Sequence, residues 1–358
     1  AKKQYDKGIS VKEIFMKNGL GICTYRDKFC YANSSDEIKN RIEIFSKQDI
    51  SENRKYFNLP QDSRDWTIQG AKDELVKTGL NENFIKQVHF KPFDFKYTYY
   101  TGKSKGFLGC PAGAIQDNML QDNLGLICYR TCGVSGLDNI FIANGLIDLH
   151  LVGSGSSLFP LYLYKQEAKK GEQDSMDEKS ENFTQDFRDF IDSKYGEHFS
   201  AEVILGYIYA VLFHKGYREK YIDFLKVDFP KVPFVESKSD FLKLSKLGSA
   251  LIELHLMQTD LSEVSVGSAV YKNDRDNVIK KISYKTKEKE IFVNDSLYFE
   301  RVEKAVWEYK IGGYAVCEKY LKSHKGETLD FTHFSKIIKT LHKTLEIESK
   351  IAKISGVF

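Results

Sequence analysis

The 358-residue sequence predicts an α+β protein: a mixed α/β N-terminal part, a helical middle part and a small, basic α+β C-terminal part. Three observations lead to this prediction. Short runs rich in β-branched and aromatic residues recur through residues 1–165, as is typical of strands. Apolar residues return every three or four positions through residues 187–257, as in helices that pack on a core. A lysine-rich stretch that alternates polar and apolar residues then indicates a hairpin at 278–295.

The first 165 residues supply strands and one clear helix. Residues 22–32 alternate loosely between polar and apolar side chains, so we expect an extended run there. Residues 33–36, Asn-Ser-Ser-Asp, predict a helix start, because such side chains accept hydrogen bonds from the free N–H groups of a first turn. The apolar positions of that helix are Ile38, Ile42 and Phe45. Further strand candidates are residues 96–102, 125–130, 139–148 and 158–164.

The middle part is predicted to consist of helices interrupted by an extended segment. One helix should have a single apolar face about 100° wide, formed by Val203, Ile204, Tyr207, Ile208, Val211 and Leu212. A second, short helix should begin near Tyr217. Pro230 and Pro233 then favour an extended chain, because each proline fixes its own φ and disfavours the helical region for the preceding residue. Asp240 is expected to cap the next helix, whose apolar positions are Phe241, Leu244, Leu247, Leu251 and Leu254.

The C-terminal part should combine the lysine-rich hairpin with a last helix. In the hairpin, Ile282 and Tyr284 alternate on one strand and Ile291 and Val293 on the other. The helix should run from about Thr332. We therefore expect four segments: a mixed α/β domain at 1–165, a polar linker at 166–186, a helical subdomain at 187–262 and a basic α+β subdomain at 263–358.

The charge is small overall but unevenly placed. Against 53 Lys and Arg stand 50 Asp and Glu, a net charge of +3. Residues 1–165 carry +4, residues 166–270 carry −6 and residues 271–358 carry +5. Two basic ends would suit a polyanion, because Lys and Arg are the side chains that neutralise phosphates. Charge blocks of this size are equally typical of solvated surface.

Cysteine usage and hydropathy point to a cytoplasmic protein. The cysteines form no CxxC pair and have no histidine at zinc-ligand spacing, so we expect free, buried thiols at Cys23, Cys30, Cys110, Cys128, Cys132 and Cys317. No apolar run approaches the roughly 18 residues that span a bilayer, and no signal-peptide pattern opens the chain. We therefore expect no membrane partner. Because the first methionine is Met16, we also expect a piece of a longer polypeptide, with catalytic parts outside it.

Three catalytic motifs are incomplete in this sequence. Residues 101–104, Thr-Gly-Lys-Ser, resemble half of a phosphate-binding P-loop, but the required earlier glycine is replaced by Tyr97. The Asn-Pro-Pro-Tyr loop, with which DNA amino-methyltransferases hold a flipped base, is absent, so this chain alone should not methylate DNA. Glu-x-Lys triplets at 37–39 and 308–310 could belong to a metal nuclease, but they arise freely in a sequence rich in Glu and Lys.

Five passages, in order, resemble one protein family. Residues 207–234, YIYAVLFHKGYREKYIDFLKVDFPKVPF, resemble the YIYAVLHSPxYRxxYxxFLKxDFPRIP passage in the C-terminal DNA-specificity region of type ISP and related single-chain type IIG restriction-modification enzymes. Residues 89–102 are similar to the family's YRPFDxRWxYY, and residues 122–130 to its NxGLIxxRQ. Residues 158–164 are similar to its FPLYLY, and residues 311–329 to its GGYQVxEKWLKxRKGRxL.

The resemblance implies a target-recognition module for duplex DNA, with residues 1–165 as the mixed α/β target-recognition domain. Such a module would bind the duplex in a basic cleft, read base edges and present the target adenine to a neighbouring S-adenosylmethionine-dependent methyltransferase domain. It would be catalytically inert alone and need no metal or cofactor of its own. Its protein partners would be the methyltransferase and nuclease domains of the same parent polypeptide.

The residues that we expect to contact DNA combine positive charge with aromatic rings. Lysines neutralise phosphates, while tyrosines hydrogen-bond them or pack on sugars. The alternative is that these residues form an ordinary strand with one solvent-exposed face. Arginine is the usual bidentate reader of guanine, so Arg130 is the candidate base reader, unless it forms a structural ion pair. The full set is Lys91, Lys96, Tyr99, Tyr100, Lys103, Lys105, Arg130, Lys319, Lys322 and Lys325. The last three are expected to contact the DNA backbone or to be solvated surface.

Two other classes of function stay open at this point. The chain could be a catalytic fragment, either a metal-dependent nuclease that uses a Glu-x-Lys group or a DNA methyltransferase with a degenerate loop. It could also be a protein-interaction scaffold that uses the acidic helical middle. Binding of labelled duplex with and without magnesium or S-adenosylmethionine would separate the three.

Overall fold

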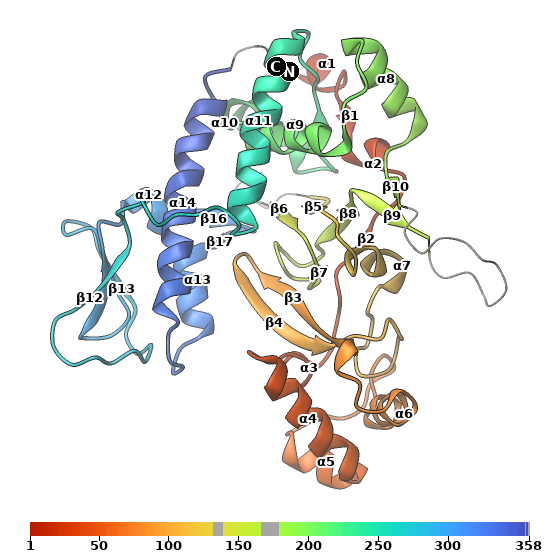
Figure 1. The fold of residues 1–358 in the computed structure, drawn as a ribbon, viewed down its shortest axis with the longest axis vertical. Coiled ribbons are helices and arrows are strands. Elements are labelled where there is room, and N and C mark those ends of the chain that lie inside the picture. The colour runs from red at the N-terminus through yellow and green to blue at the C-terminus, as the bar shows by residue number, and fades with distance from the viewer. Residues whose placement is uncertain (132–138, 166–178, 355, 357–358) are drawn as a thin grey trace. The chain divides into compact units, whose positions relative to one another are not determined.

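The computed structural model describes residues 1–131, 139–165, 179–354 and 356, and its fold is α+β, as the sequence predicts (Figure 1). The chain divides into two compact units. Unit 1 comprises Ala1–Ile14, Arg130–Ile142 and Thr184–Phe358, and unit 2 comprises Phe15–Tyr129 and Ala143–Phe183. The four segments expected from the sequence divide the chain at other points and stay a prediction; most of the expected linker, residues 166–178, lies outside the described residues.

The described part of unit 2 contains small sheets and short helices. Strand β8 (Ser157–Pro160) is antiparallel to both β2 (Gly19–Leu20) and β5 (Gly125–Cys128). Strands β3 (Ile85–Lys91) and β4 (Asp94–Tyr99) form an antiparallel hairpin, which β7 (Leu146–Ile147) joins in parallel with β3. Strands β9 (Tyr162–Tyr164) and β10 (Lys179–Glu181) pair separately. The helices are α3 (Asp27–Cys30), α4 (Ser35–Lys47), α5 (Ile50–Tyr56), α6 (Ile68–Thr78) and α7 (Gly113–Gln116), with 3-10 turns at Glu82–Phe84 and Asp117–Met119.

Most sequence predictions for residues 1–165 are confirmed. Ser34 caps α4 by accepting the N–H of Glu37 at 3.2 Å, and the three predicted apolar positions of that helix are buried. The strand candidates appear as β4, β5, β7 with β6 (Ile140–Ala143), and β8 with β9. The extended run expected at 22–32 is wrong in its second half, where α3 forms. The hydroxyl of Thr24 accepts the N–H of Arg26 at 3.0 Å, and such a local side-chain turn competes with strand pairing.

The chain passes between the two units four times, and two of these crossings, after Ile14 and before Thr184, are hydrogen-bonded to each other. The N–H of Thr184 donates to the carbonyl of Ile14 at 2.9 Å, within unit 1. One residue further along, within unit 2, Phe15 forms an antiparallel bridge with Phe183. The N–H of Met16 then donates to the carbonyl of Asn182 at 2.9 Å. The first and the last of these crossings are therefore paired with each other, while residues 130–142 lie between them in the sequence and belong to unit 1.

Unit 1 is built around α9 (Ala201–Phe213), which is buried on all sides. Every residue from 204 to 213 is buried. The sequence predicted burial of only one face of this helix, about 100° wide, whereas the whole circumference is buried. The segment AEVILGYIYAVLF carries one charge, and a helix that is apolar all round is enclosed by its neighbours. The neighbouring helices include α10 (Lys215–Leu225), α11 (Lys238–His255) and α14 (Phe331–Ile351) (Figure 1).

Helices α9 and α11 approach each other at a pair of glycines. A Cβ atom on Gly248 would lie 1.8 Å from the carbonyl oxygen of Gly206. A Cβ atom on Gly206 would lie 2.6 Å from the carbonyl oxygen of Ser245. The two backbones therefore touch where neither has a side chain. The cap of α11 is Ser237, which accepts the N–H of Asp240 at 3.3 Å, so the expectation that Asp240 is the cap was wrong. Asp240 lies in the first turn, where a carboxylate is favoured by the helix dipole.

The segment around Pro230 and Pro233 is extended, as predicted, and tyrosines bind its backbone. Part of it, β11 (Lys231–Val232), pairs antiparallel with β1 (Ile9–Ser10). Three hydroxyls donate to alternate carbonyl oxygens, each across 2.7 Å: Tyr217 to Lys231, Tyr207 to Pro233 and Tyr195 to Val235. These tyrosines come from α10, α9 and α8 (Gln185–Tyr195). Three helices therefore hold one extended strand through their side chains.

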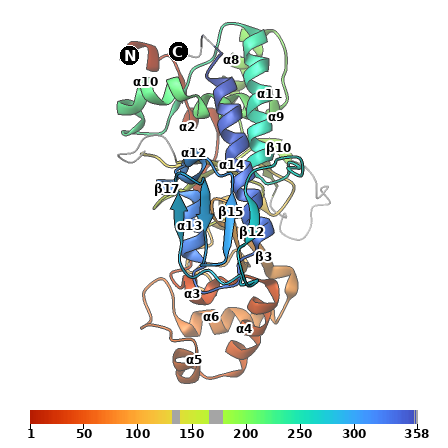
Figure 2. The ribbon, with the colours of Figure 1, turned by 90° about the vertical axis from the view of Figure 1, so that its left-hand side faces the viewer.

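The C-terminal part of unit 1 pairs a four-stranded antiparallel sheet with α14. The strand order is β12 (Ser268–Tyr271), β15 (Leu297–Glu300), β14 (Glu290–Phe292), β13 (Ser283–Lys285), so the lysine-rich hairpin and the last helix are both confirmed. Phe299 of the sheet meets Phe334 of α14 edge-on, with ring centroids 4.9 Å apart. Figure 2 shows the sheet beside α13 (Val316–Ser323) and α14. The remaining elements of the unit are α1 (Lys2–Tyr5), α2 (Val11–Ile14), α12 (Lys304–Trp307), β16 (Lys310–Ile311) and β17 (Tyr314–Ala315).

The described cysteines are free, but not all are buried. Cys110 is exposed and Cys23 is partly exposed, which corrects the expectation of buried thiols for these two. Each donates its backbone N–H to the other's carbonyl, so the two residues form an isolated antiparallel bridge. Cys132 lies outside the described residues. No described helix is long and apolar enough to cross a membrane.

Candidate nucleic-acid interface

A loop that carries two lysines follows the β3–β4 hairpin in unit 2. We call residues 101–107 the basic loop. Lys103 and Lys105 are exposed on it. Gly102 and Lys105 have φ angles of +77° and +58°, and the left-handed region is one that glycine enters freely and lysine rarely. The N–H of Lys105 donates to the carbonyl of Gly109 at 2.9 Å. The loop therefore has a tightly turned, hydrogen-bonded backbone from which both lysine side chains project.

The basic loop is tied to α6 by the carboxylate of Glu74, which is 2% exposed. Its Oε1 accepts the hydroxyl of Thr101, and its Oε2 accepts the backbone N–H of Phe107. One side chain thus holds the first and the last residue of the loop. Sequence reasoning missed Glu74. The available signal was a carboxylate that interrupts the apolar positions Ile68, Ala71 and Leu75 of α6.

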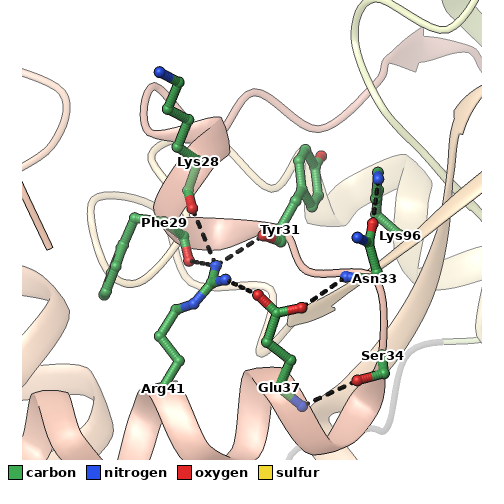
Figure 3. A network of polar contacts seen from close by, with 8 residues as sticks. All are labelled: Lys28, Phe29, Tyr31, Asn33, Ser34, Glu37, Arg41 and Lys96. Carbon is green, nitrogen blue, oxygen red and sulfur yellow. Dashed lines mark hydrogen bonds and ion pairs between the residues drawn. The ribbon is translucent and has the colours of Figure 1, made fainter. Parts of the chain in front are cut away.

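Lys91 and Lys96 lie on the hairpin, and their ammonium groups have partners within the chain. Lys91 donates to the carbonyl of His150 and lies 3.9 Å from the buried carboxylate of Asp148. Burial raises the pKa of the Asp148 carboxyl, and the charge of Lys91 opposes that rise. Lys96 donates to the side-chain oxygen of Asn33 (Figure 3). A phosphate would have to compete with these partners.

Asn33 belongs to a network of polar contacts at the start of α4 (Figure 3). The carboxylate of Glu37 accepts the guanidinium of Arg41 at 2.5 Å and the N–H of Asn33 at 3.2 Å. Arg41 donates in turn to the carbonyls of Lys28, Phe29 and Tyr31. Glu37, one of the carboxylates considered for a nuclease, is therefore engaged in holding the helix start. Among the described residues, no three His, Cys, Asp or Glu side chains gather as a metal site requires.

Tyr99 and Tyr100 point into the unit and are only 1% and 2% exposed. The hydroxyl of Tyr99 donates to the carbonyl of Gly79 at 2.8 Å. The hydroxyl of Tyr100 donates to the carboxylate of Asp117 at 2.6 Å, and burial together with that carboxylate raises its pKa. Both rings thus support the hairpin from inside. A direct contact with nucleic acid would require uncovering them.

Arg130 belongs to unit 1, and its side chain is 69% exposed. Its Nε lies 3.0 Å from Oδ1 of Asp228, which is also largely exposed. Burial pushes the pKa of Asp228 upward, but the N–H of Phe229 and the guanidinium of Arg130 outweigh it, so the pKa lies below its ordinary value. A bond through Nε engages one edge of the guanidinium. The other edge, with two NH₂ groups, can also pair with the two acceptors of a guanine.

The C-terminal candidates lie on or after α13, also in unit 1. Lys319 Nζ lies 5.0 Å from the ring centre of Tyr314. Lys322 forms an exposed ion pair with Glu318 at 2.7 Å, a kind of contact that contributes little to stability. Lys325 is exposed beyond the helix end. The ten candidates therefore fall into six on the hairpin and basic loop of unit 2 and four in unit 1.

Comparisons with known proteins support one family. The family model described as the Type ISP C-terminal specificity domain matches residues 13–350. No curated protein matches the chain. Three solved structures share its fold: the ATP-dependent Type ISP restriction-modification enzyme LlaBIII bound to DNA (20% identity, TM-score 0.71), a DrdV–DNA complex (21%, 0.70) and a nuclease-deletion mutant of the Type ISP enzyme LlaGI with a DNA substrate mimic (18%, 0.67). They cover 98%, 96% and 97% of this chain, which spans only 24%, 36% and 34% of theirs.

Proposed function

Because the chain belongs to the family of Type ISP C-terminal specificity domains, we propose that it recognises a target sequence in duplex DNA as one module of a larger restriction-modification enzyme. The family match over residues 13–350 carries the proposal. The similar LlaBIII and DrdV structures contain DNA, and the LlaGI structure contains a DNA substrate mimic. The chain spans about a quarter to a third of those proteins, so its role is that of a part.

Within this proposal, the ten candidates have different tasks. Lys103 and Lys105 are exposed on a hydrogen-bonded loop and would supply positive charge for phosphates. Arg130 presents a planar fork, the shape that pairs with two acceptors of one guanine. Lys91, Lys96, Lys319 and Lys322 would add phosphate contacts after exchanging their present partners, and Lys325 would add one directly. Tyr99 and Tyr100 support the hairpin that carries the loop.

Catalysis would take place elsewhere in the parent polypeptide. The 358 residues contain no Asn-Pro-Pro-Tyr loop, so we assign methyl transfer and S-adenosylmethionine to a neighbouring methyltransferase domain. Cleavage would fall to a nuclease domain. The module itself would need no cofactor, and its partners would be duplex DNA and these two domains.

Binding of labelled duplex across a salt series tests the proposal. We expect weak binding to random duplex, with a slope of log affinity against log salt of about −0.9 for each phosphate contacted. A pool of random duplexes, enriched over several rounds of binding, should yield one preferred sequence. Salt-independent binding, or enrichment of no sequence, would contradict the proposal. Methylated adenine or cut DNA after incubation with S-adenosylmethionine or magnesium would instead support the catalytic alternative.

A further inference from the structure

We propose that Glu74 is a positioning residue for DNA binding: its buried carboxylate holds the basic loop in the shape that directs Lys103 and Lys105 towards phosphates. Glu74 itself would not touch DNA. The inference rests on the proposed DNA-binding function and adds to it the element that prepares the phosphate contact.

The first support is the placement of the two hydrogen bonds. An ionised carboxylate is costly to bury unless it is hydrogen-bonded, and bonds to a charged group are stronger than neutral ones. In Glu74, one oxygen accepts from Thr101 and the other from Phe107. Since these residues begin and end the basic loop, the carboxylate links the two ends of the loop to each other and to α6. The indole N–H of Trp66 adds a bond to the carbonyl of Phe107 at 3.0 Å.

The second support is the close fit between the loop and α6. Gly70 and Glu74 lie one turn apart on the same face of that helix. A Cβ atom on Gly70 would lie 2.6 Å from the carbonyl oxygen of Lys105. A Cβ atom on Gly106 would lie 1.9 Å from Oε2 of Glu74. The loop backbone therefore lies directly against α6 at Gly70, and at Gly106 the missing side chain leaves the space that the Glu74 carboxylate occupies.

As a result, the backbone of Lys103 and Lys105 should lose little conformational entropy when DNA binds. With both loop ends held and Lys105 at a φ of +58°, the main chain between them is already arranged before a ligand arrives. Binding by a prearranged loop avoids the entropy cost of ordering it. Simple electrostatics predicts the opposite role for Glu74, because a carboxylate near the phosphates should weaken binding. Removal of the Glu74 carboxylate should therefore weaken DNA binding if Glu74 positions the loop, and strengthen DNA binding if Glu74 only repels phosphates.

The decisive comparison is between Glu74→Leu and Glu74→Gln. Both remove the same charge, but only glutamine keeps hydrogen bonds, since its oxygen can accept from Phe107 and its NH₂ can donate to Thr101. We expect Glu74→Leu to flatten the salt slope for random duplex by up to about 1.8, the share of two phosphates, and to weaken binding at low salt. Glu74→Gln should keep the wild-type slope. Asp73→Asn is the matched control, because Asp73 is exposed on the same helix and its carboxylate accepts a hydrogen bond from the side chain of Gln69 at 2.6 Å.

A second measurement reports on the loop without DNA. Trypsin cleaves after exposed lysines in mobile chain, so cleavage after Lys103 and Lys105 should be about tenfold faster in Glu74→Leu, because a lost hydrogen bond to a charged group shifts an opening equilibrium by about that much. Glu74→Gln and Asp73→Asn should be cleaved like the wild type. If Glu74→Leu fails to fold, Thr101→Val removes one donor with little change of shape and should show the same trends more weakly.

The outcomes separate this inference from the proposed function. Equal salt slopes for Glu74→Leu and Glu74→Gln, or unchanged cleavage in Glu74→Leu, would overturn the positioning role while leaving DNA binding intact. Tighter binding by Glu74→Leu would favour simple electrostatics and also overturn it. A wild-type chain that binds no duplex would overturn the proposed function, and with it the role of Glu74.

Discussion

The hydroxyl of Tyr207 donates a hydrogen bond to the carbonyl oxygen of Pro233 across 2.7 Å. The same hydroxyl accepts the N–H of Val235 at 3.0 Å. Tyr207 is fully buried in the centre of α9, and burial raises its pKa well above the ordinary value, so the donor proton stays in place. One side chain thus satisfies two backbone groups of an extended strand that has prolines instead of ladder donors at two positions.

Tyr207→Phe should lower the free energy of unfolding by about 1–3 kcal/mol, because it leaves a partly buried carbonyl and a buried N–H without their partner. Urea denaturation followed by circular dichroism measures the change. Tyr56→Phe is the control, since Tyr56 is 60% exposed and its loss should cost less than about 0.5 kcal/mol. Equal stability of the two variants would show that water replaces the Tyr207 hydroxyl.

Gly248→Ala should destabilise unit 1 by about 3 kcal/mol or more, because the new methyl group would lie 1.8 Å from a backbone oxygen that cannot move alone. Helices α9 and α11 would have to separate. The same denaturation assay applies. Ser239→Ala, an exposed substitution in the first turn of α11, controls for a general effect on the helix. A Gly248→Ala protein as stable as this control would mean that the helices can shift freely at their crossing.

Acid should destabilise the protein through His255. Burial, with the nearby charge of Arg218, lowers the pKa of His255 to about 3, from an ordinary value of 6.5. Its Nδ1 meets the hydroxyl of Tyr209 at 2.7 Å and its Nε2 that of Thr344 at 3.0 Å. Between pH 6.5 and pH 3 the unfolded chain binds a proton that the folded chain does not. The contribution of the neutral ring is therefore complete above pH 6.5 and is lost as the pH falls, at about 1.4 kcal/mol per pH unit.

The measurement is the difference in unfolding free energy between the wild type and His255→Gln. That difference should change by about 2 kcal/mol from pH 7 to pH 5, in favour of the variant, which cannot titrate. Burial raises the pKa values of Asp148 and Glu348, which act in the opposite direction, but they are common to both proteins and cancel. A difference that does not depend on pH would show that His255 accepts its proton in the folded state.

Mutations should separate base-specific recognition of DNA from sequence-independent binding to its phosphates. Arg130→Ala should cost about 1–3 kcal/mol on the preferred sequence and much less on scrambled duplex, because only bidentate base contacts discriminate. Lys103→Ala and Lys105→Ala should weaken both duplexes nearly equally and flatten the salt slope by about one unit each. Affinities on both duplexes across a salt series provide the test. If Arg130→Ala weakens both by the same factor, Arg130 contacts phosphate or serves structure, and base reading lies elsewhere.

The elements that the sequence predicted well are those whose cause is local. Periodic apolar residues identified α4, α9 and α14, two-residue alternation identified the β13–β14 hairpin, and the prolines identified the extended segment. The errors arose where side chains compete or where neighbours decide. The turn formed by the Thr24 hydroxyl and the N–H of Arg26 precedes α3 in a run that alternates in sequence, and Ser237 caps α11 three residues before Asp240. The burial of α9 on every side depends on helices that are distant in sequence.

For the candidate site, the sequence identified the charges but not their surroundings. Composition alone does not distinguish an exposed lysine such as Lys103 from Lys91, whose charge faces the buried Asp148. The sequence-based prediction also placed Tyr99 and Tyr100 among the DNA contacts, whereas both rings are buried. Glu74 was missed because its two partners lie 27 and 33 residues away in the chain. Such long-range bonds leave no local pattern.

The paired ribbon at Ile14 and Thr184 has a consequence for how such modules diversify. The two ends of residues 15–183 lie side by side, because the carbonyl of Ile14 and the N–H of Thr184 are hydrogen-bonded at 2.9 Å. That stretch contains both the basic loop and Arg130, while α9, α11 and α14 lie after it. A genetic exchange with crossovers at these two points would replace the candidate phosphate-binding and base-reading residues together and leave the ends of the helical part joined as before. Such an exchange would keep α9, α11 and α14 but would also replace Phe141, whose ring stacks on His255 of α11, so the incoming segment must carry a side chain that fits there.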